Sequence, residues 1–254
     1  MPDVLSQSRH GDVLVMTINR PEKRNALNYE VSVELAAAMD TLDSDPDLRV
    51  GILTGAGGSF SAGMDLKAFG EGQLPMIDGR GLAGFVEAPP KKPLIAAVEG
   101  FALAGGFEVA LACDIIVASR TASFGLPEAK RSLLAAGGGL IRLPLRIPPN
   151  IAKELAMTGA SIDGEQAARL GVVNRLADPG GALEAALTLA GEIAANGPLG
   201  VTAAKAVIDL TSEHPESEVW KLQIPINDAV AGSEDAKEGA AAFVEKREPV
   251  WTGR

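Results

Sequence analysis

Short runs of consecutive apolar residues alternate with amphipathic stretches in the first half of the chain. Four runs, at residues 13–18, 50–53, 94–98 and 115–118, are bounded by glycine, proline or charged residues, and each predicts a buried strand. From Asn28 to about residue 43, apolar positions recur at helical spacing, and Asn28 can cap that helix. Strands that are apolar on both faces and separated by helices predict a parallel sheet covered on both sides. The expected fold class is therefore α/β.

The pattern changes near Gly137, where the strand-like runs end. Beyond it, helices are expected at residues 151–158, 164–170, 182–195, 203–210, 218–231 and 235–247. No linker divides the chain, so a sheet core with a helical C-terminal region is expected instead of two independent domains. Residues 70–84 are rich in glycine, proline and polar side chains, and they predict a mobile loop.

Composition and charge narrow the function. The 254 residues are 46% hydrophobic and 22% charged, which is typical of a globular protein. The net charge of −10 disfavours nucleic acid as a partner and argues weakly against an anionic membrane surface. No run approaches the roughly 18 apolar residues that a membrane-spanning helix needs. The start of the chain lacks the features of a signal peptide, so a cytoplasmic location is expected.

Scarce cysteine and histidine remove several chemistries. Cys113, His10 and His214 are the only such residues, so a zinc site is disfavoured and no metal is expected. Both histidines are predicted in surface loops, which disfavours a Ser-His-Asp triad. There is no nucleophile elbow and no phosphate-binding P-loop, and the glycines after residue 53 lack the full dinucleotide-binding spacing.

Two glycine-containing turns each connect a predicted strand to a predicted helix. They read FSAGMD at residues 60–65, where Asp65 opens a short helix, and ALAGGFE at residues 102–108, which leads into a helix ending near residue 112. Glycine allows close backbone approach, and the first N–H groups of a helix lack intrahelical acceptors. Two such turns could direct two N–H groups at one oxygen, forming an oxyanion hole. The residues alone leave open that both are simple packing turns.

Two glutamates accompany these turns. Glu108 follows Gly105 by three positions in an otherwise apolar stretch, where burial would raise its pKa. Glu128 follows a short strand, and Pro127 stiffens the turn that presents it. Two carboxyl groups beside an oxyanion hole can hold a water molecule and move its protons. Taken alone, Glu128 could equally be an acid that favours the start of a helix.

Several motifs in a fixed order resemble the crotonase (enoyl-CoA hydratase/isomerase) family over nearly the whole chain. They are RNAL at 24–27, FSAGMD at 60–65, KPLIAAVEG at 92–100, GGFE at 105–108, CDII at 113–116, FGLPE at 124–128 and AFVEKREP at 242–249. The resemblance implies a spiral of β-β-α turns with a helical C-terminal trimerisation region. It implies a core with the acyl-CoA site in residues 1–195, and a region for oligomerisation and for covering CoA in residues 196–254.

The resemblance also implies roles for individual residues. The backbone N–H groups of Met64 and Gly105 would bind the thioester carbonyl, and Glu108 and Glu128 would flank the catalytic water. The leading expectation is an enoyl-CoA hydratase, a lyase that needs no cofactor because CoA is part of its substrate. Residues expected beside the substrate or CoA are Arg24, Ala26, Leu27, Ala62, Asp65, Leu66, Pro127, Phe243 and Lys246.

The C-terminal region carries two further expectations. Lys246 would reach CoA bound by a neighbouring subunit, while Phe243, three residues earlier on the same helix, would pack inward. Apolar stripes on the helices at 151–158 and 182–195 look too large for one subunit to cover. Together with the resemblance, they predict a homotrimer or a dimer of trimers.

The sequence departs from the hydratase pattern after Glu128. Ala135 stands where hydratases often have proline, and Leu140 and Ile141 replace a commoner Thr-Gln pair. This segment borders the acyl group in the family, so the acyl substrate stays open. The alternatives are an enoyl-CoA isomerase, a dehydratase of a polar 3-hydroxyacyl-CoA such as carnitinyl-CoA, and a non-catalytic CoA- or RNA-binding homologue. A nicotinamide-dependent oxidoreductase is a more distant alternative.

Overall fold

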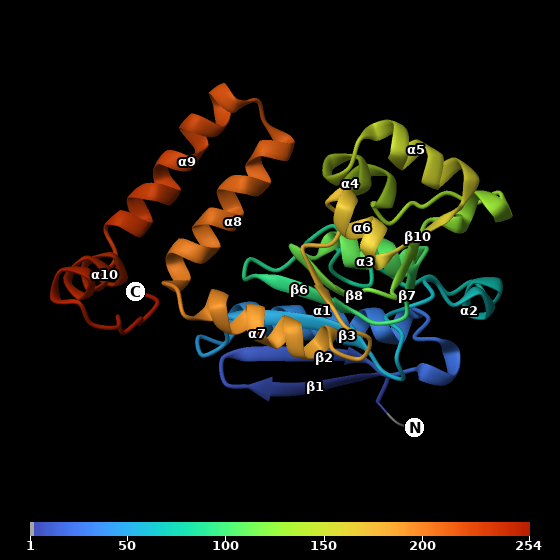
Figure 1. The fold of residues 1–254 in the computed structure, drawn as a ribbon, viewed down its shortest axis with the longest axis horizontal. Coiled ribbons are helices and arrows are strands. Elements are labelled where there is room, and N and C mark those ends of the chain that lie inside the picture. The colour runs from blue at the N-terminus through green and yellow to red at the C-terminus, as the bar shows by residue number, and fades with distance from the viewer. Residues whose placement is uncertain (1–2) are drawn as a thin grey trace.

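A six-stranded sheet organises the computed structural model, which describes residues 3–254 (Figure 1). The strand order is β1 (Leu5–His10), β2 (Val13–Ile18), β3 (Val50–Gly55), β6 (Leu94–Val98), β8 (Ile115–Ser119) and β11 (Arg175–Ala177). Strand β1 pairs with β2 antiparallel, and every other pair in this sheet is parallel. The α/β class and the parallel sheet predicted from the apolar runs are confirmed.

Alternate residues of the central strands enter two separate apolar cores. Met16 and Leu53 lie in a core with helices α1 (Tyr29–Ser44) and α3 (Gly105–Ala112). Val15 and Ile52 point the other way, toward helix α7 (Ala182–Ala194). Successive side chains of a strand face opposite sides of a sheet, so strands covered on both faces must be apolar at every position.

Several predicted helix signals act as expected. The Asn28 side chain accepts a hydrogen bond from the Val31 N–H and caps α1. Asp65 caps the short helix α2 (Leu66–Gly70) through the Lys67 and Ala68 N–H groups. The remaining elements between α3 and α7 are the 3-10 helix η2 (Pro127–Arg131) and the helices α4 (Gly139–Arg146), α5 (Pro149–Thr158) and α6 (Gly164–Leu170).

A second, three-stranded sheet lies beside the first, and only its strand before Glu128 was predicted. Its order is β10 (Ser161–Asp163), β9 (Ser123–Gly125) and β7 (Phe101–Leu103), with β7 and β9 parallel. These strands have only three residues each, too few for a hydrophobic period to show in the sequence. This sheet brings the ends of β7 and β9 side by side, where the candidate site lies.

Other differences from the sequence prediction have physical reasons. Strand β1 is polar and almost entirely exposed at the edge of the sheet, so it lacks the apolar signal of the central strands. The expected mobile loop at 70–84 contains an antiparallel pair, β4 (Met76–Ile77) and β5 (Gly81–Leu82). Helix α4 was missed because Pro144 interrupts its pattern. Short strands β10 and β11 interrupt the region expected to be almost all helix.

Three helices extend away from the sheet at the C-terminal end of the chain (Figure 1). They are α8 (Pro198–Glu213), α9 (Glu216–Ala231) and α10 (Glu234–Glu245). Helices α8 and α9 pack on each other, and no residue of α8 is buried. Among residues 3–254, no helix is long and apolar enough to cross a membrane.

The stripes used to predict an oligomer are largely covered by the chain itself. Ala186 and Ala190 of α7 are fully buried against the sheet, and Leu155 of α5 is 6% exposed. Ile151 is partly buried and packs against the main core, while Leu183, Leu187 and Ile193 do so against the second core. That argument for association was wrong, because the sheet offers α7 a complete apolar face.

A buried carboxylate fastens the end of the chain. Asp235, 4% exposed, accepts hydrogen bonds from the Thr252 N–H, the Thr252 hydroxyl and the Gly253 N–H at 2.7–3.0 Å. These bonds lower the pKa of Asp235 below its ordinary value of 3.8, against the opposing effect of burial. The Trp251 indole N–H adds a bond to the Ala195 carbonyl.

Asp235→Ala is expected to lower the free energy of unfolding by about 1–3 kcal/mol, because it leaves the Thr252 and Gly253 donors without their acceptor. Glu234→Ala, next to it on the exposed side, should change it by less than about 0.5 kcal/mol. Because the folded-state pKa of Asp235 is lowered, its contribution is present above pH 3.8 and lost as the pH falls further. Denaturant unfolding at pH 7 and pH 3 measures both effects; equal stability of the two variants at pH 7 would contradict this assignment.

Candidate active site

Backbone hydrogen bonds tie three segments together at the ends of β7 and β9. The Ser61 N–H donates to the Phe101 carbonyl, and the Leu103 N–H donates to the Ser61 carbonyl, both at 3.0 Å. The Ala104 N–H donates to the Gly125 carbonyl at 2.9 Å. The two predicted glycine turns and the Glu128 turn are therefore adjacent in space.

The two predicted oxyanion donors lie close together. A methyl group placed on Gly105 would be 3.5 Å from the Met64 nitrogen, and one placed on Gly63 would be 2.8 Å from the Gly105 nitrogen. Gly63 also has a φ of +91°, so glycine is needed here for both conformation and space. Within residues 3–254, neither the Met64 N–H nor the Gly105 N–H has an acceptor. Two free, adjacent donors are what an oxyanion hole requires.

Ala104 holds a strained conformation directly before the second donor. Its φ of 52° and ψ of −130° are unusual for a residue with a side chain and cost about 1–3 kcal/mol. The residue turns the chain from β7 into α3 at a single position and places the Gly105 N–H at the first position of that helix. Strain of this kind at a helix start is consistent with a site in which donor position matters more than local stability.

Glu108 lies in the first turn of α3 and is 4% exposed. Its pKa is raised to about 7, chiefly by burial, and the nearby Glu128 contributes to that rise. The opposing effects come from the Gly139 N–H, which donates to Oε1 at 3.0 Å, from the Gly137 N–H and from the Arg142 charge. The expected buried glutamate with a raised pKa is confirmed, and it changes charge near neutral pH.

Glu128 lies at the start of η2, just after Pro127 at the first position of that helix. Its carboxyl is partly buried, and burial raises its pKa, with Arg131 opposing. Its Oε2 atom is shielded from solvent, and no donor among residues 3–254 reaches it. A buried acceptor without a partner is costly in a protein interior, so this atom has a free position for a donor from a ligand.

Leu82 of β5 connects the oxyanion donors with Glu108. Its Cδ2 atom would lie 3.4 Å from a methyl group on Gly105 and 2.5 Å from one on Gly137. The same methyl on Gly137 would lie 2.8 Å from Glu108 Oε2. The two N–H donors and the Glu108 carboxyl thus border one apolar side chain, which lies in the segment 70–84 that was predicted to be a mobile loop.

The segments expected beside CoA pair with each other. The Ala62 N–H donates to the Arg24 carbonyl at 3.0 Å, and the Leu27 N–H donates to the Gly63 carbonyl at 2.8 Å. Arg24 and Leu66 are exposed, Ala26 is partly buried, and Leu27 is fully buried. Residues 24–27 and residues 62–66, both expected beside CoA, are therefore adjacent in space.

The Asp65 carboxylate has a structural partner. It forms an ion pair with Arg20 at 3.0 Å, and both side chains are less than one-fifth exposed. The hydrogen bond from Arg20 lowers the Asp65 pKa against the opposing effect of burial. The Asp65 N–H donates to the Leu27 carbonyl at 2.8 Å. Asp65 therefore braces the backbone next to Met64.

The C-terminal residues expected near CoA lie elsewhere in the chain. Helix α10 ends at Glu245, not at residue 247, and Lys246 caps it in a left-handed conformation with its side chain exposed. Phe243 is 85% exposed, so the expectation that it packs inward was wrong. The inner face of α10 is made of small residues, with Gly239 against Trp251 and Ala242 buried. In Figure 1, α10 and α2 lie at opposite ends of the molecule.

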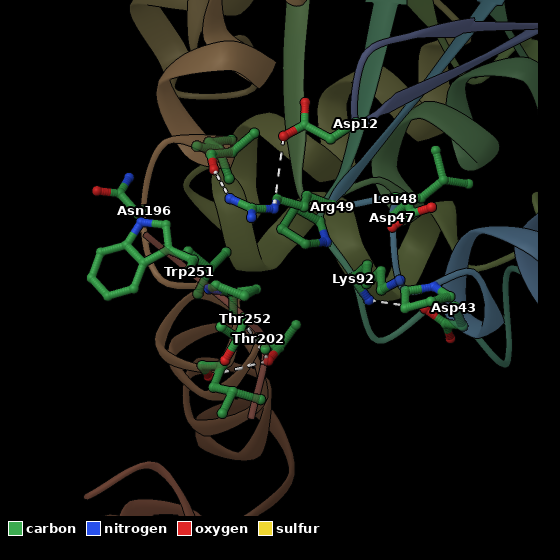
Figure 2. Close-up of a pocket in the computed structure, with 18 of the residues that line it drawn as sticks. Asp12, Asp43, Asp47, Leu48, Arg49, Lys92, Asn196, Thr202, Trp251 and Thr252 are labelled. Atoms are coloured by element: carbon green, nitrogen blue, oxygen red, sulfur yellow. Dashed lines mark hydrogen bonds and ion pairs between the residues drawn. The ribbon is translucent and has the colours of Figure 1, made fainter. Parts of the chain in front are cut away.

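A cavity of about 560 Å³ lies away from this site, where α8 and the C-terminal tail leave the core. Figure 2 shows Arg49, Lys92 and Trp251 among its lining residues. The Arg49 guanidinium bonds to the Ala194 carbonyl and pairs with Asp12, so its charge is already engaged. None of the predicted site residues lines this cavity. Over the described chain, no three His, Cys, Asp or Glu side chains gather as metal ligands.

Sequence reasoning missed four contributors to the site: Leu82, Gly137, Gly139 and Arg142. The run of glycines at 137–139 was a usable signal, because three successive glycines allow close backbone approach. Leu82 gave no signal, because it is an isolated leucine whose role depends on the pairing of β4 with β5.

Comparisons with known proteins agree with this geometry. The sequence profile of the family described as enoyl-CoA hydratase/isomerase matches residues 8–254. A carnitinyl-CoA dehydratase from Citrobacter koseri is 44% identical over 262 residues, covering all of both chains.

Solved structures agree in fold as well. An enoyl-CoA hydratase from Mycobacterium marinum is 56% identical with a TM-score of 0.97, covering 99% of this chain and 100% of the other. A carnitinyl-CoA hydratase from Mycobacterium avium is 40% identical with a TM-score of 0.79, covering all of both chains. The crotonase fold expected from the sequence is confirmed, and the chain belongs to the enoyl-CoA hydratase/isomerase family of the crotonase superfamily.

Proposed function

We propose that this protein is an enoyl-CoA hydratase, a lyase that adds water reversibly across the double bond of a 2-enoyl-CoA thioester. The observation that carries the proposal is the arrangement of Glu108 and Glu128. One carboxyl is buried with a pKa of about 7, the other has a buried oxygen without a donor, and both accompany two free backbone N–H groups.

The backbone donors stabilise the charge that develops on the thioester oxygen. When the water oxygen bonds to C3, the electrons of the double bond move toward the carbonyl and form an enolate-like state. The Met64 and Gly105 N–H groups would bind this oxygen. The loss of one such donor raises a reaction barrier by about 3–4 kcal/mol.

The carboxyl pair accounts for the protons. Two interacting carboxyl groups titrate together, so around neutral pH the pair can carry one proton. The ionised member takes a proton from the water as its oxygen bonds to C3, and the neutral member supplies the proton that C2 receives. The Glu128 Oε2 atom, which lacks an internal donor, can accept the O–H of that water. No metal or further cofactor is needed for these steps.

A second candidate reaction is the dehydration of carnitinyl-CoA. It is favoured by relatives of this name that are 44% identical over the full chain. The bonds are those of hydration in reverse, so the same residues serve both directions. The neighbours of Glu108 include the apolar Leu82 and Leu126, which favours an uncharged acyl group over a trimethylammonium group. Solved hydratases at 55–56% identity point the same way.

We also propose association into a homotrimer or a dimer of trimers, with CoA reached by a neighbouring subunit. Helix α8 buries no residue, and Ile208, Trp220 and Ile224 on α8 and α9 are each more than half exposed. Exposed apolar side chains on projecting helices favour a second copy of the chain as a partner. Lys246 lies far from the Ala62–Leu66 segment of its own chain, so a contact with CoA would have to cross between subunits.

A panel of acyl-CoA thioesters tests the function. Crotonyl-CoA, longer 2-enoyl-CoAs and an enoyl-CoA carrying a trimethylammonium group are incubated with the enzyme, and loss of the enoyl-thioester absorbance is followed. Fastest hydration of an uncharged substrate supports the hydratase. Preference for the cationic substrate would favour the carnitinyl reaction, and double-bond migration without water addition would favour an isomerase.

Glu108→Gln and Glu128→Gln are each expected to lower kcat by at least about 100-fold, because each removes a group that transfers a proton. The wild-type rate should fall above an apparent pKa near 7, where the pair loses its shared proton, and again at lower pH, where both carboxyls are protonated. As a control for folding, each variant should still bind the 3-hydroxyacyl-CoA product in isothermal titration calorimetry. Near-normal turnover in either variant would make that glutamate structural.

The assembled protein should have the mass of three or six 26.1 kDa chains in multi-angle light scattering. Association is expected because α8 and α9 expose apolar side chains that a neighbouring chain would cover. A monomer at micromolar concentration would contradict the proposed association.

Lys246→Ala is expected to raise KM for an acyl-CoA by about 5- to 30-fold and to leave kcat nearly unchanged, because a phosphate contact acts equally in ground and transition states. Lys237→Ala, on the exposed side of the same helix, is the matched control. The effect should shrink as salt rises and vanish with a pantetheine thioester that lacks the nucleotide phosphates. An equal loss with both substrates would assign Lys246 to subunit packing instead.

A further inference from the structure

Arg142 is a partly buried cation without an ion-pair partner. It lies in the first turn of α4, and its Nη2 atom donates to the Val86 carbonyl at 2.6 Å. Over residues 3–254, no carboxylate oxygen lies within 4.0 Å of its guanidinium. Burial lowers its pKa, which shows that part of its hydration is lost. A buried charge without a direct partner is expensive, so its presence beside the site needs a reason.

The guanidinium lies against the loop that holds Glu108. A methyl group placed on Gly138 would meet the Nη1 atom of Arg142 at 2.1 Å. The next residue, Gly139, donates its N–H to Glu108 Oε1 at 3.0 Å, and the Gly137 N–H also favours the ionised carboxyl. The Arg142 guanidinium therefore lies between this loop and the Val86 carbonyl, next to the donors that Glu108 accepts from.

The charge of Arg142 acts on the same carboxyl. It lowers the Glu108 pKa, whereas Glu128 raises it. The other groups that face Arg142 are Glu87, Cys113 and Arg146. Burial raises the pKa of the Cys113 thiol, so that group is neutral at ordinary pH. Arg146 instead bonds to the Leu111 and Cys113 carbonyls at the end of α3.

We propose that Arg142 is a positioning residue for Glu108: its guanidinium holds the 137–139 loop in the place where the Gly139 N–H meets the Glu108 carboxyl. It acts through the loop and through space, and it does not touch the reacting atoms. The inference rests on the proposed function only for its consequence in catalysis, because the interaction with Glu108 exists in the free protein.

The direct test is a carbon-13 NMR titration of the glutamate carboxyl groups, with Glu108→Gln to identify the Glu108 resonance. Arg142→Gln is expected to raise the Glu108 pKa by roughly 0.5–1 pH unit, since a positive charge near a partly buried carboxyl favours its ionised form. Arg142→Lys keeps the charge and should retain most of the wild-type value. If Arg142→Gln does not fold, Arg142→Met, with an apolar stem of similar length, carries the same expectation.

Two controls separate this role from packing and from net charge. Arg146→Gln removes a neighbouring buried arginine, and it is expected to lower the melting temperature without moving the Glu108 pKa. Lys130→Gln removes an exposed charge from η2 and should change neither. An Arg142→Gln protein that is folded but has an unchanged Glu108 pKa, or an equal shift in Arg146→Gln, would overturn the proposal.

The pH–rate profile gives the second readout. In Arg142→Gln, the limb near pH 7 should move to higher pH by the same amount as the NMR value, whereas a merely structural role would lower the rate equally at all pH values. If the apparent pKa near 7 in the pH–rate profile of Arg142→Gln is unchanged while the rate falls equally at all pH values, Arg142 does not act on catalysis through Glu108. If the wild-type protein hydrates no acyl-CoA, the proposed function fails, and the NMR titration still decides the role of Arg142.

Discussion

The close approach of two backbone segments at Gly63 and Gly105 is the constraint on which the rest of the site depends. The Ser61–Phe101 and Leu103–Ser61 hydrogen bonds place the two turns in contact, and only glycine at position 63 leaves room for the Gly105 nitrogen. The strained Ala104 backbone and the Arg20–Asp65 ion pair hold the two ends of this junction. As a result, the Met64 and Gly105 N–H groups have no acceptor within residues 3–254. Unpaired donors lower the stability of the fold, but they are available to bind a substrate oxygen.

The second feature of the site is the unequal support that the ionised forms of Glu108 and Glu128 receive from neighbouring groups. Glu108 is buried among apolar neighbours, so its ionised form needs support, and that support comes from the glycine loop and from Arg142. Glu128 has less support, and one of its oxygens meets no donor within residues 3–254. With its pKa of about 7, Glu108 changes charge near neutral pH, which is the property that proton transfer to and from water requires.

The C-terminal helices α8 and α9 differ from the core in that their apolar side chains are not covered by the rest of the chain. Helix α7 completes the sheet and buries its apolar face within the chain, whereas α8 and α9 extend away and keep apolar residues exposed. The C-terminal tail is nevertheless held in place by hydrogen bonds to the Asp235 carboxylate and by the bond from the Trp251 indole to the Ala195 carbonyl. The exposed apolar side chains of α8 and α9 are the basis of the proposed contact with another copy of the chain. Lys246 is an exposed cation at the end of α10, in a protein of net charge −10.

Local sequence is enough to predict the parallel sheet, the caps at Asn28 and Asp65, the two glycine turns and the pair of glutamates. Each of these depends on local properties: an unbroken apolar run, a capping side chain, a glycine before a helix, an acid in an apolar stretch. Local sequence predicts neither the contribution of Leu82, nor the place of Arg142 beside the glycine loop, nor the exposed position of Phe243, because each depends on tertiary packing. Leu82 lies in a two-residue strand, Arg142 acts on a carboxyl 34 positions earlier in the chain, and Phe243 is turned outward because small residues occupy the inner face of α10. Such roles arise from contacts between backbone segments that are far apart in the sequence, and a local pattern of residue types cannot predict those contacts.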